Sequence, residues 1–376
     1  MKVAFISSYN PIDRSKRSGI VYSMYKEMLK YNEIIWVEPK VNFWERFVLR
    51  GIVRLRDFIC HFYKSDMTTL SPIYSKQFGK ALSRQLKNIE CDYIFSYDCE
   101  QFAYIKTDKP IVYRTDSTYH KLVDYYYFNV PKFMNKEADK VQKKALEKCF
   151  AVVTPCDWVK DSIANDYHVD TTKVHVIESG ANLEKIPPVY ERIWSKEKFR
   201  MLFIGIDTKR KGVDVAIETA HILNEKYGIN AMLTIVGGEI SKELKQKKYI
   251  DWVGFLDKNN PKESRYFEQL IKESHLFIFP TMAECAGIVN CEASAYGLPI
   301  LSYDTGGVGN YVINGVNGYR LPLTAKGEDF AKKIVKMFEA NEFLKLSDGG
   351  RKLYEEKFNW ETWGEKYHEE IEKLLK

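Results

Sequence analysis

The sequence lacks the long apolar runs of membrane-spanning proteins, because no stretch reaches the roughly 18 consecutive apolar residues of a transmembrane helix. The opening run Met1–Ile6 is also shorter than the apolar part of a signal peptide, and it predicts a first strand instead. We therefore expect a cytoplasmic protein, located either in the cytosol or at the inner face of the cell membrane.

Cysteine-based and metal-based chemistry have little support in the composition. The seven cysteines form no C-x-x-C pair, which disfavours a zinc site and favours free thiols in a reducing cytosol. No D-x-D sequence is present to carry Mg²⁺, so we expect neither a metal nor another cofactor. Nucleic-acid modules and internal repeats are absent as well. The net charge of +6 suits an anionic ligand or a membrane surface without requiring nucleic acid.

What is present is a strand–helix alternation that starts twice. A length of 376 residues favours two domains. Apolar strands alternate with helical segments from Lys2 onward, and the same pattern starts afresh at Met201. Alternation of this kind is typical of doubly wound α/β domains. The sequence therefore predicts two Rossmann-like domains, at residues 1–185 and 190–357.

The most informative stretch runs from Leu276 to Pro299. An apolar strand ends at Phe279, a short loop carries Glu284, and a helical segment begins near Gly287 and carries Glu292. Sheets of this type bind ligands beyond the carboxyl ends of their strands, where the N–H groups at a helix start suit a phosphate. The two glutamates can hold different parts of one ligand. The plainer interpretation is a helix-start carboxylate and a solvated helix-face carboxylate.

The spacing Glu284-x7-Glu292 resembles the E-x7-E motif of the retaining glycosyltransferases of family 4. The resemblance implies the GT-B fold, with two domains facing a cleft and a last helix, residues 358–376, that returns to the first domain. It implies an acceptor domain first and a donor domain second. The expected reaction moves a sugar, with retention, from a UDP- or GDP-linked donor to a saccharide or lipid-linked acceptor in cell-surface polysaccharide or glycolipid synthesis.

The resemblance also assigns roles to residues of the second domain. Glu284 would contact the donor sugar and Glu292 the ribose, while Lys211 and Arg210 would bind the diphosphate and stabilise it on departure. Gly205 matches the family pattern, but an isoleucine at 206 stands where the family has arginine. A solvated charge run is the plain alternative for the Lys-Arg-Lys loop. The remaining donor-site candidates are Gly19, Phe255, Cys285, Ala286, Gly287, Ile288 and Val289.

Two residues of the first domain are candidates for orienting the acceptor or the donor sugar. Asp116 and His120 follow an apolar strand, Ile111–Arg114, so both are expected at a carboxyl edge. Many members of the resembled family carry a histidine near this point, and here the closest match is Asp116. The sequence leaves the choice between the two open. The alternative for Asp116 is that it caps the next helix.

Residues 43–62 form a second distinctive segment. Aromatic and aliphatic residues recur there at helical spacing among several arginines. A cationic amphipathic helix rich in aromatic residues can lie on an anionic membrane surface. The alternative is a surface helix whose apolar face packs on the core. The segment therefore predicts a helix with two possible uses.

Two other functions remain open at this stage. A non-catalytic protein that binds nucleotide-sugars would need Glu292 and the phosphate loop, but it need not keep Glu284 or Lys211. A GT-B epimerase would share much of the donor site, whereas a phosphorylase would need a pyridoxal lysine that no context here suggests. The fold alone does not separate these functions.

Overall fold

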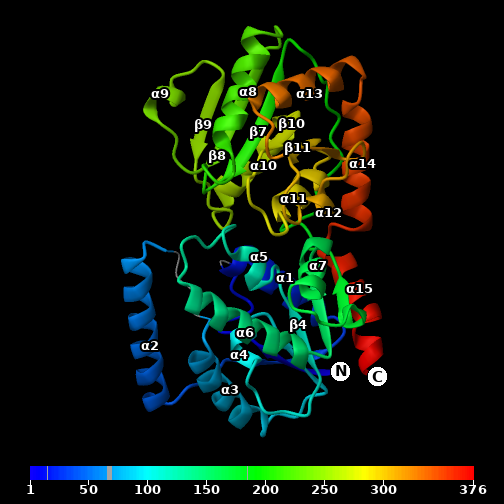
Figure 1. Ribbon diagram of the computed structural model, residues 1–376. Coiled ribbons are helices and arrows are strands. Elements are labelled where there is room, and N and C mark those ends of the chain that lie inside the picture. Colours follow the sequence, from blue (N-terminus) through cyan, green and yellow to red (C-terminus); the bar gives the residue numbers. More distant parts are fainter. Residues whose placement is uncertain (15, 66–69, 184) are drawn as a thin grey trace. The chain divides into compact units, whose positions relative to one another are not determined.

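The computed structural model describes residues 1–14, 16–65, 70–183 and 185–376 of the chain. Two compact units are present (Figure 1): unit 1 comprises Met1–Glu178 with Trp360–Lys376, and unit 2 comprises Ser179–Asn359. Unit 1 thus ends before the predicted boundary at residue 185. Across the described ranges, no helix combines the length and the apolar composition needed to cross a bilayer.

Unit 1 is built on a parallel sheet. Within its described residues, six strands lie in the order β2-β1-β3-β4-β5-β6. The chain leaves β1 toward β2 and then crosses to β3 on the other side, so the order reverses between β1 and β3. Ligands of such sheets bind outside the carboxyl ends at this reversal. The strands are β1 (Lys2–Ile6), β2 (Glu33–Val37), β3 (Tyr93–Ser96), β4 (Ile111–Arg114), β5 (Ala151–Thr154) and β6 (Val174–Val176).

Helices cover the sheet of unit 1 because most of its strands are fully buried and need apolar partners on both faces. Short 3₁₀ turns occur at Lys16–Gly19, Thr171–Lys173 and Glu372–Leu375. The α-helices are α1 (Ile20–Met28), α2 (Phe43–Phe62), α3 (Pro72–Leu86), α4 (Cys99–Phe102), α5 (Tyr119–Leu122), α6 (Lys132–Lys148), α7 (Asp157–Asn165) and α15 (Trp360–Glu370).

The last helix belongs to unit 1, as predicted. α15 packs against α1, and the ring of Tyr367 lies 5.9 Å from that of Phe95. Beyond α15 the carboxylate of Glu372 is buried, and it accepts a hydrogen bond from the hydroxyl of Tyr93 at 2.8 Å. These contacts fix the C-terminal segment to β3 of the sheet.

Unit 2 has the strand order of dinucleotide-binding domains. Within its described residues, six parallel strands lie in the order β12-β11-β10-β7-β8-β9. Since β7 is the first strand of the unit, this order corresponds to 6-5-4-1-2-3, with the reversal between β7 and β10. The strands are β7 (Phe199–Gly205), β8 (Ala231–Gly237), β9 (Ile250–Gly254), β10 (Leu276–Phe279), β11 (Ile300–Tyr303) and β12 (Gly318–Leu321).

Two hydrophobic clusters stabilise unit 2. One cluster includes Phe199, Leu233 and Ile334, and the other includes Leu202, Phe277 and Tyr311. Neighbouring residues along β7 and β10 thus enter different clusters, as expected for strands buried on both faces. The helices are α8 (Val213–Glu225), α9 (Lys242–Lys245), α10 (Pro261–Glu273), α11 (Ile288–Ala295), α12 (Val308–Tyr311), α13 (Gly327–Glu339) and α14 (Phe343–Glu356).

The predicted helix at residues 43–62 is present as α2, but its aromatic face does not pack on the core. The helix begins with a capping box between Asn42 and Glu45. Its buried residues are Leu49, Arg56 and Cys60. The alternative of a core-packed apolar face is therefore wrong, because the following side chains are exposed: Phe43, Trp44, Phe47, Val48, Leu55, Phe58 and Phe62.

Candidate active site

The segment around Glu284 has the predicted strand–loop–helix form. The N-cap of α11 is Gly287, whose φ of 78° lies in the left-handed region that suits glycine. In the first turn of α11 the N–H of Asn290 donates to the carbonyl of Gly287 at 2.8 Å, whereas the first N–H groups of a helix have no partner within it. The flanking residues are close-packed: Ala286 and Gly287 are buried, and Cys285, Ile288 and Val289 are half-buried. A helix start thus lies at the carboxyl edge of the sheet, next to Glu284.

Lys211 and Glu284 form an ion pair shielded from water. The Lys211 ammonium donates a hydrogen bond to Oε2 of Glu284, and Nζ lies 4.7 Å from the centroid of the Phe279 ring. Only 15% and 13% of the two side chains are exposed. Burial lowers the pKa of Lys211, and the charge of Glu284 opposes that shift. For Lys211 the alternative of a solvated charge run is therefore wrong.

Arg210 connects the loop after β7 to the loop after β10. Its guanidinium donates to the backbone oxygen of Ala283 at 2.7 Å and pairs with Asp207 at 3.1 Å. The backbone N–H of Met282 in turn donates to the carbonyl of Arg210 at 2.9 Å. Arg210 thus brings its charge to the same edge as Lys211, although the backbone position usual for the arginine is occupied by Ile206.

Gly205 allows Lys211 to fold back over the end of β7. A Cβ added at Gly205 would lie 2.9 Å from Cγ of Lys211, closer than carbon atoms pack. The loop after β11 completes the surroundings, because the N–H of Gly307 donates to the carbonyl of Glu284 at 3.0 Å. Three strand-end loops therefore meet around Glu284.

Glu292 is buried, not solvated. It lies on the second turn of α11 with 6% of its side chain exposed, and Nζ of Lys258 donates to its Oε2 at 2.7 Å. Lys258 belongs to the loop between β9 and α10, and 44% of its side chain is exposed. The plain interpretation of Glu292 as a solvated helix-face carboxylate is wrong. Sequence reasoning missed Lys258, because nothing near it in the chain marks a partner for Glu292.

Asn290 is a second residue that the sequence did not reveal. Its side chain is fully buried beside Gly287, and neither Oδ1 nor Nδ2 has a hydrogen-bond partner among the described residues. An unpartnered buried amide costs on the order of 1–3 kcal/mol. Nothing in the local sequence of α11 distinguishes Asn290 from an ordinary polar residue of the helix.

Phe255 lies apart from the residues around Glu284. It follows β9 at the edge of the sheet, and 64% of it is exposed. An exposed ring next to Gly254, whose φ is 81°, offers a flat apolar surface for a ligand. Its assignment to the nucleotide base stays a prediction.

In unit 1, Asp116 is held at the carboxyl end of β4. Arg114, which is fully buried, pairs with one carboxylate oxygen at 2.9 Å, and the hydroxyl of Tyr97 donates to the other. Asp116 does not cap the next helix, because the N-cap of α5 is Thr118. That alternative is therefore wrong. Two partners fix the carboxylate in one orientation.

His120 and Gly19 occupy different surroundings in unit 1. His120 lies on α5 with 55% of its side chain exposed and Nε2 3.8 Å from Asp166. Gly19 is buried at the N-cap of α1, with a φ of 78°. It ends the loop that follows β1, beside the reversal of strand order, where Arg17 of the same loop pairs with Asp98 after β3 at 2.7 Å. Asp116 is thus the more firmly oriented of the two acceptor-side candidates.

The edge of unit 2 suits a ligand with both an anionic and a hydroxylic part. Lys211, Arg210 and the start of α11 provide positive charge at the reversal of strand order. Glu284 pairs with Lys211, and the buried Glu292 lies further along α11. Over the described parts of the chain, no group of three or more His, Cys, Asp or Glu side chains is arranged to hold a metal ion.

Comparison with known proteins identifies the family. The model for glycosyl transferases group 1 matches residues 191–351, which contain the site of unit 2, and the model for glycosyltransferase family 4 matches residues 46–185. The chain belongs to the group 1 glycosyltransferases. Its fold is GT-B, as the sequence predicted: it superposes on a lipopolysaccharide outer core galactosyltransferase with a TM-score of 0.67, at 14% identity, covering 99% of this chain and 100% of that one.

Two further relatives illustrate the family. A capsular polysaccharide biosynthesis glycosyltransferase of Staphylococcus aureus is 28% identical over 49% of this chain and 49% of its own length. An Anabaena protein solved in complex with UDP has a TM-score of 0.63 at 14% identity, covering 99% of this chain and 100% of that one. The chain spans about half the length of the curated relatives it matches, with 54%, 44% and 56% covered in three of them.

Proposed function

We propose that this group 1 glycosyltransferase moves a sugar from a nucleotide-sugar to a saccharide or lipid-linked acceptor, with retention at the anomeric carbon. The observation that carries the proposal is the shielded Lys211–Glu284 pair beside the start of α11. A shielded cation and a helix start stabilise a leaving diphosphate, and an adjacent carboxylate binds sugar hydroxyls. Polysaccharide synthesis in a staphylococcal relative and UDP in a structural neighbour agree with this reaction.

Each residue then has a defined task. Lys211 and Arg210 hold the diphosphate, and they oppose the negative charge that grows on it as the bond to the anomeric carbon breaks. Glu284 accepts hydrogen bonds from the donor sugar. Glu292 accepts from the ribose hydroxyls, which replace Lys258 as its partners. Because the cations are supplied by side chains, the reaction needs no metal and no further cofactor.

Unit 1 would bind the acceptor. Asp116, fixed by Arg114 and Tyr97, orients an acceptor hydroxyl at the carboxyl edge of its sheet. A lipid-linked acceptor would be met at the inner face of the cell membrane, which the exposed aromatic side chains of α2 suit.

The first test is binding without added metal. Thermal stability is measured with UDP, GDP, UDP-linked sugars and GDP-linked sugars. The proteins compared are the native protein, Glu292→Ala and the control Glu339→Ala, which removes an exposed carboxylate of the same unit. A nucleotide at 100 times its dissociation constant stabilises by roughly 2.7 kcal/mol. We expect one base to stabilise the native protein and the control but not Glu292→Ala. No response from any nucleotide would contradict the proposal.

The second test is turnover with the donor so identified. Transfer of labelled sugar to a saccharide or glycolipid acceptor supports the proposal. Binding without transfer would favour a non-catalytic binding protein, and conversion of the donor into its epimer would favour an epimerase. Nuclear magnetic resonance of the product reports retention or inversion at the anomeric carbon.

A further inference from the structure

Helix α2 presents a large apolar surface that unit 1 leaves uncovered. Figure 1 shows α2 along the periphery of unit 1. The exposed fractions of Phe47, Phe58 and Phe62 are 68%, 70% and 74%. With 3.6 residues per turn, these residues lie on the side opposite Leu49 and Cys60, which face the core. A contiguous exposed apolar patch of this kind marks a docking surface.

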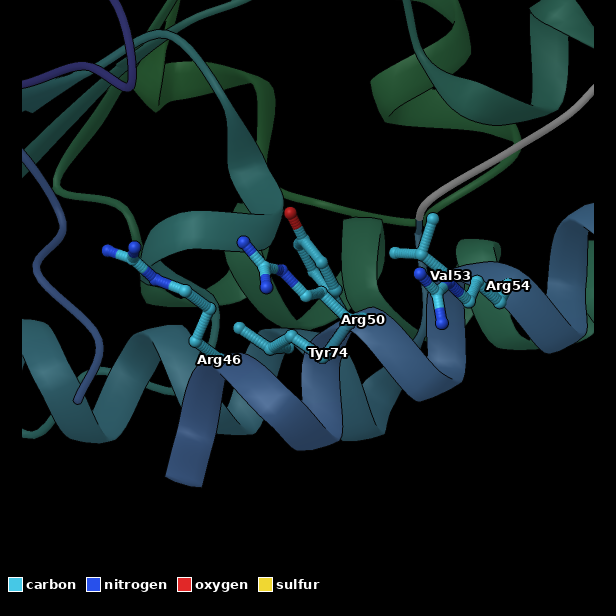
Figure 2. Close-up of a pocket in the computed structure, with 6 residues that line it drawn as sticks. Arg46, Arg50, Val53, Arg54 and Tyr74 are labelled. Atoms are coloured by element: carbon cyan, nitrogen blue, oxygen red, sulfur yellow. The ribbon is translucent and has the colours of Figure 1, made fainter. Parts of the chain in front are cut away.

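A row of arginines borders this apolar surface. Arg46, Arg50 and Arg54 recur at every fourth residue, so they lie on one face between the core side and the aromatic side of α2. Figure 2 shows them projecting from α2 together with Tyr74 of α3, and they line a groove with a volume of about 370 Å³. The groove therefore combines three guanidinium groups with one phenol.

Nothing that the structure describes neutralises this row. Two other arginines near α2 are paired: Arg56 with Glu137 at 2.5 Å, and Arg84 with Glu45 at 2.9 Å. Among the described residues, by contrast, no carboxylate forms an ion pair with the three arginines that line the groove. Like charges four residues apart on a helix repel each other, so an external anion would stabilise the row.

We propose that α2 docks on an anionic lipid bilayer, where Arg46, Arg50 and Arg54 bind lipid phosphate groups and the aromatic side chains enter the acyl-chain boundary. The charge of the groove selects phosphate, because guanidinium groups bind phosphate oxygens in a bidentate manner. The apolar surface beside it selects a lipid over a free phosphate, because a water-soluble anion would leave that surface in water.

The position of Tyr74 connects the docked surface to the acceptor edge. The pKa of Tyr74 is raised to about 12, first by burial and then by the charges of Glu100 and Asp98, which follow β3 at the reversal of strand order in unit 1. Helix α3, which carries Tyr74, packs against α4, the helix that directly follows β3, so the groove is on the helix next to the strand-end segment expected to bind the acceptor. This inference deepens the proposed function, on which it rests for its biological use: the acceptor would be lipid-borne and presented at the membrane.

The test is cosedimentation of the full chain with vesicles, made of phosphatidylcholine alone or mixed with phosphatidylglycerol. We expect binding to the anionic vesicles only, weakened by salt. The variant Arg46→Gln/Arg50→Gln/Arg54→Gln is expected to partition about 100-fold less, at about fivefold per arginine. The control Lys242→Gln/Lys247→Gln/Lys248→Gln removes the same charge from exposed residues of unit 2 and should bind like the native protein.

A second variant, Phe47→Ser/Phe58→Ser, separates the apolar from the electrostatic contribution. It should lose vesicle binding while keeping the arginine row. Three results would overturn the proposal: equal binding to neutral vesicles, loss of binding in the lysine control equal to that in the arginine variant, or competition by millimolar inorganic phosphate, which would make the groove a site for a free anion. A dimer in vesicle-free sedimentation that dissociates in Phe47→Ser/Phe58→Ser would also overturn it, by assigning the surface to a second copy of the chain.

These experiments distinguish a failure of membrane docking from a failure of the proposed transferase function. All variants should retain the nucleotide-induced thermal shift of unit 2, which also shows that they are folded. Transfer to a water-soluble acceptor without vesicle binding would refute membrane docking alone. Vesicle binding by a protein that neither binds nucleotides nor transfers sugar would refute the transferase alone.

Discussion

Replacing Lys211 by methionine tests the central ion pair of the site. Methionine keeps an apolar stem of similar length but removes the ammonium group that lies over the ring of Phe279. Glu284, with 13% of its side chain exposed, would then lack its cationic partner. Breaking a fully buried pair costs about 3–5 kcal/mol. Because this pair retains some exposure, we expect about 2–3 kcal/mol, or a melting temperature roughly 4–12 °C lower.

The reverse change, Glu284→Gln, should cost less stability. Burial already lowers the pKa of Lys211 below 10.5, and without Glu284 that pKa falls further. At pH values between the lowered pKa of folded Lys211 and 10.5, Lys211 binds a proton in the unfolded chain but not in the folded protein. Folding stability of Glu284→Gln should therefore recover as the pH rises through that window.

The double variant Lys211→Met/Glu284→Gln completes the cycle. It should be more stable than Lys211→Met, with a coupling energy of about 1–3 kcal/mol. Transfer by Lys211→Met should fall about 100- to 1,000-fold in kcat, the usual effect of removing one group that stabilises leaving-group charge. The control Lys226→Met breaks an exposed pair with Glu328 and should change neither quantity. Strict additivity of the single variants, or native turnover by Lys211→Met, would refute the reasoning.

Three further predictions concern unit 2. Lys258→Met should destabilise the free protein by about 1–3 kcal/mol, because it leaves the buried Glu292 without its hydrogen bond. It should also enlarge the thermal shift caused by the nucleotide, because the ribose no longer competes with Lys258 for Glu292. An unchanged thermal shift would contradict this competition. Asn290→Leu should raise the melting temperature measured by differential scanning fluorimetry, since it removes an unpartnered buried amide. A lower melting temperature than that of the native protein would show that the Asn290 amide has a stabilising partner. His275 has a pKa lowered from 6.5 to about 4, first by burial and then by Arg192. Below pH 6.5 the unfolded chain binds a proton that the folded protein does not, so stability should fall from pH 6.5 to 4. The loss is at most about 3 kcal/mol before solvent screening, and urea titrations should show less of it in His275→Asn.

The strand and the helix around Glu284 and Glu292 are predictable from the sequence because their arrangement is local. Leu276–Phe279 can only be a buried strand, and Gly287 marks the helix start, so Glu284 and Glu292 were placed on their elements before any tertiary contact was known. The loop with Lys211 was identified in the same way. Lys258 and Asn290 were missed because their environments are created by distant segments, and neither residue carries a local pattern.

Some alternatives required the folded chain. For Asp116, helix capping and a fixed carboxylate are equally consistent with the sequence, and only the positions of Tyr97, Arg114 and Thr118 distinguish them. Likewise, the strand pattern stops near residue 177, and only the contacts of the folded chain place the segment after Glu178 with unit 2.

Helix α2 separates what the sequence determines from what the tertiary structure decides. Periodicity and the capping residues Asn42 and Glu45 determine that residues 43–62 form a helix with an apolar side and a basic side, because both properties depend on spacing along one chain. The periodicity of the sequence does not determine which side of α2 packs on the core. Packing of Cys60 against Met134 and pairing of Arg56 with Glu137 turn the aromatic side outward, since contacts with another helix fix the rotation of α2 about its own axis.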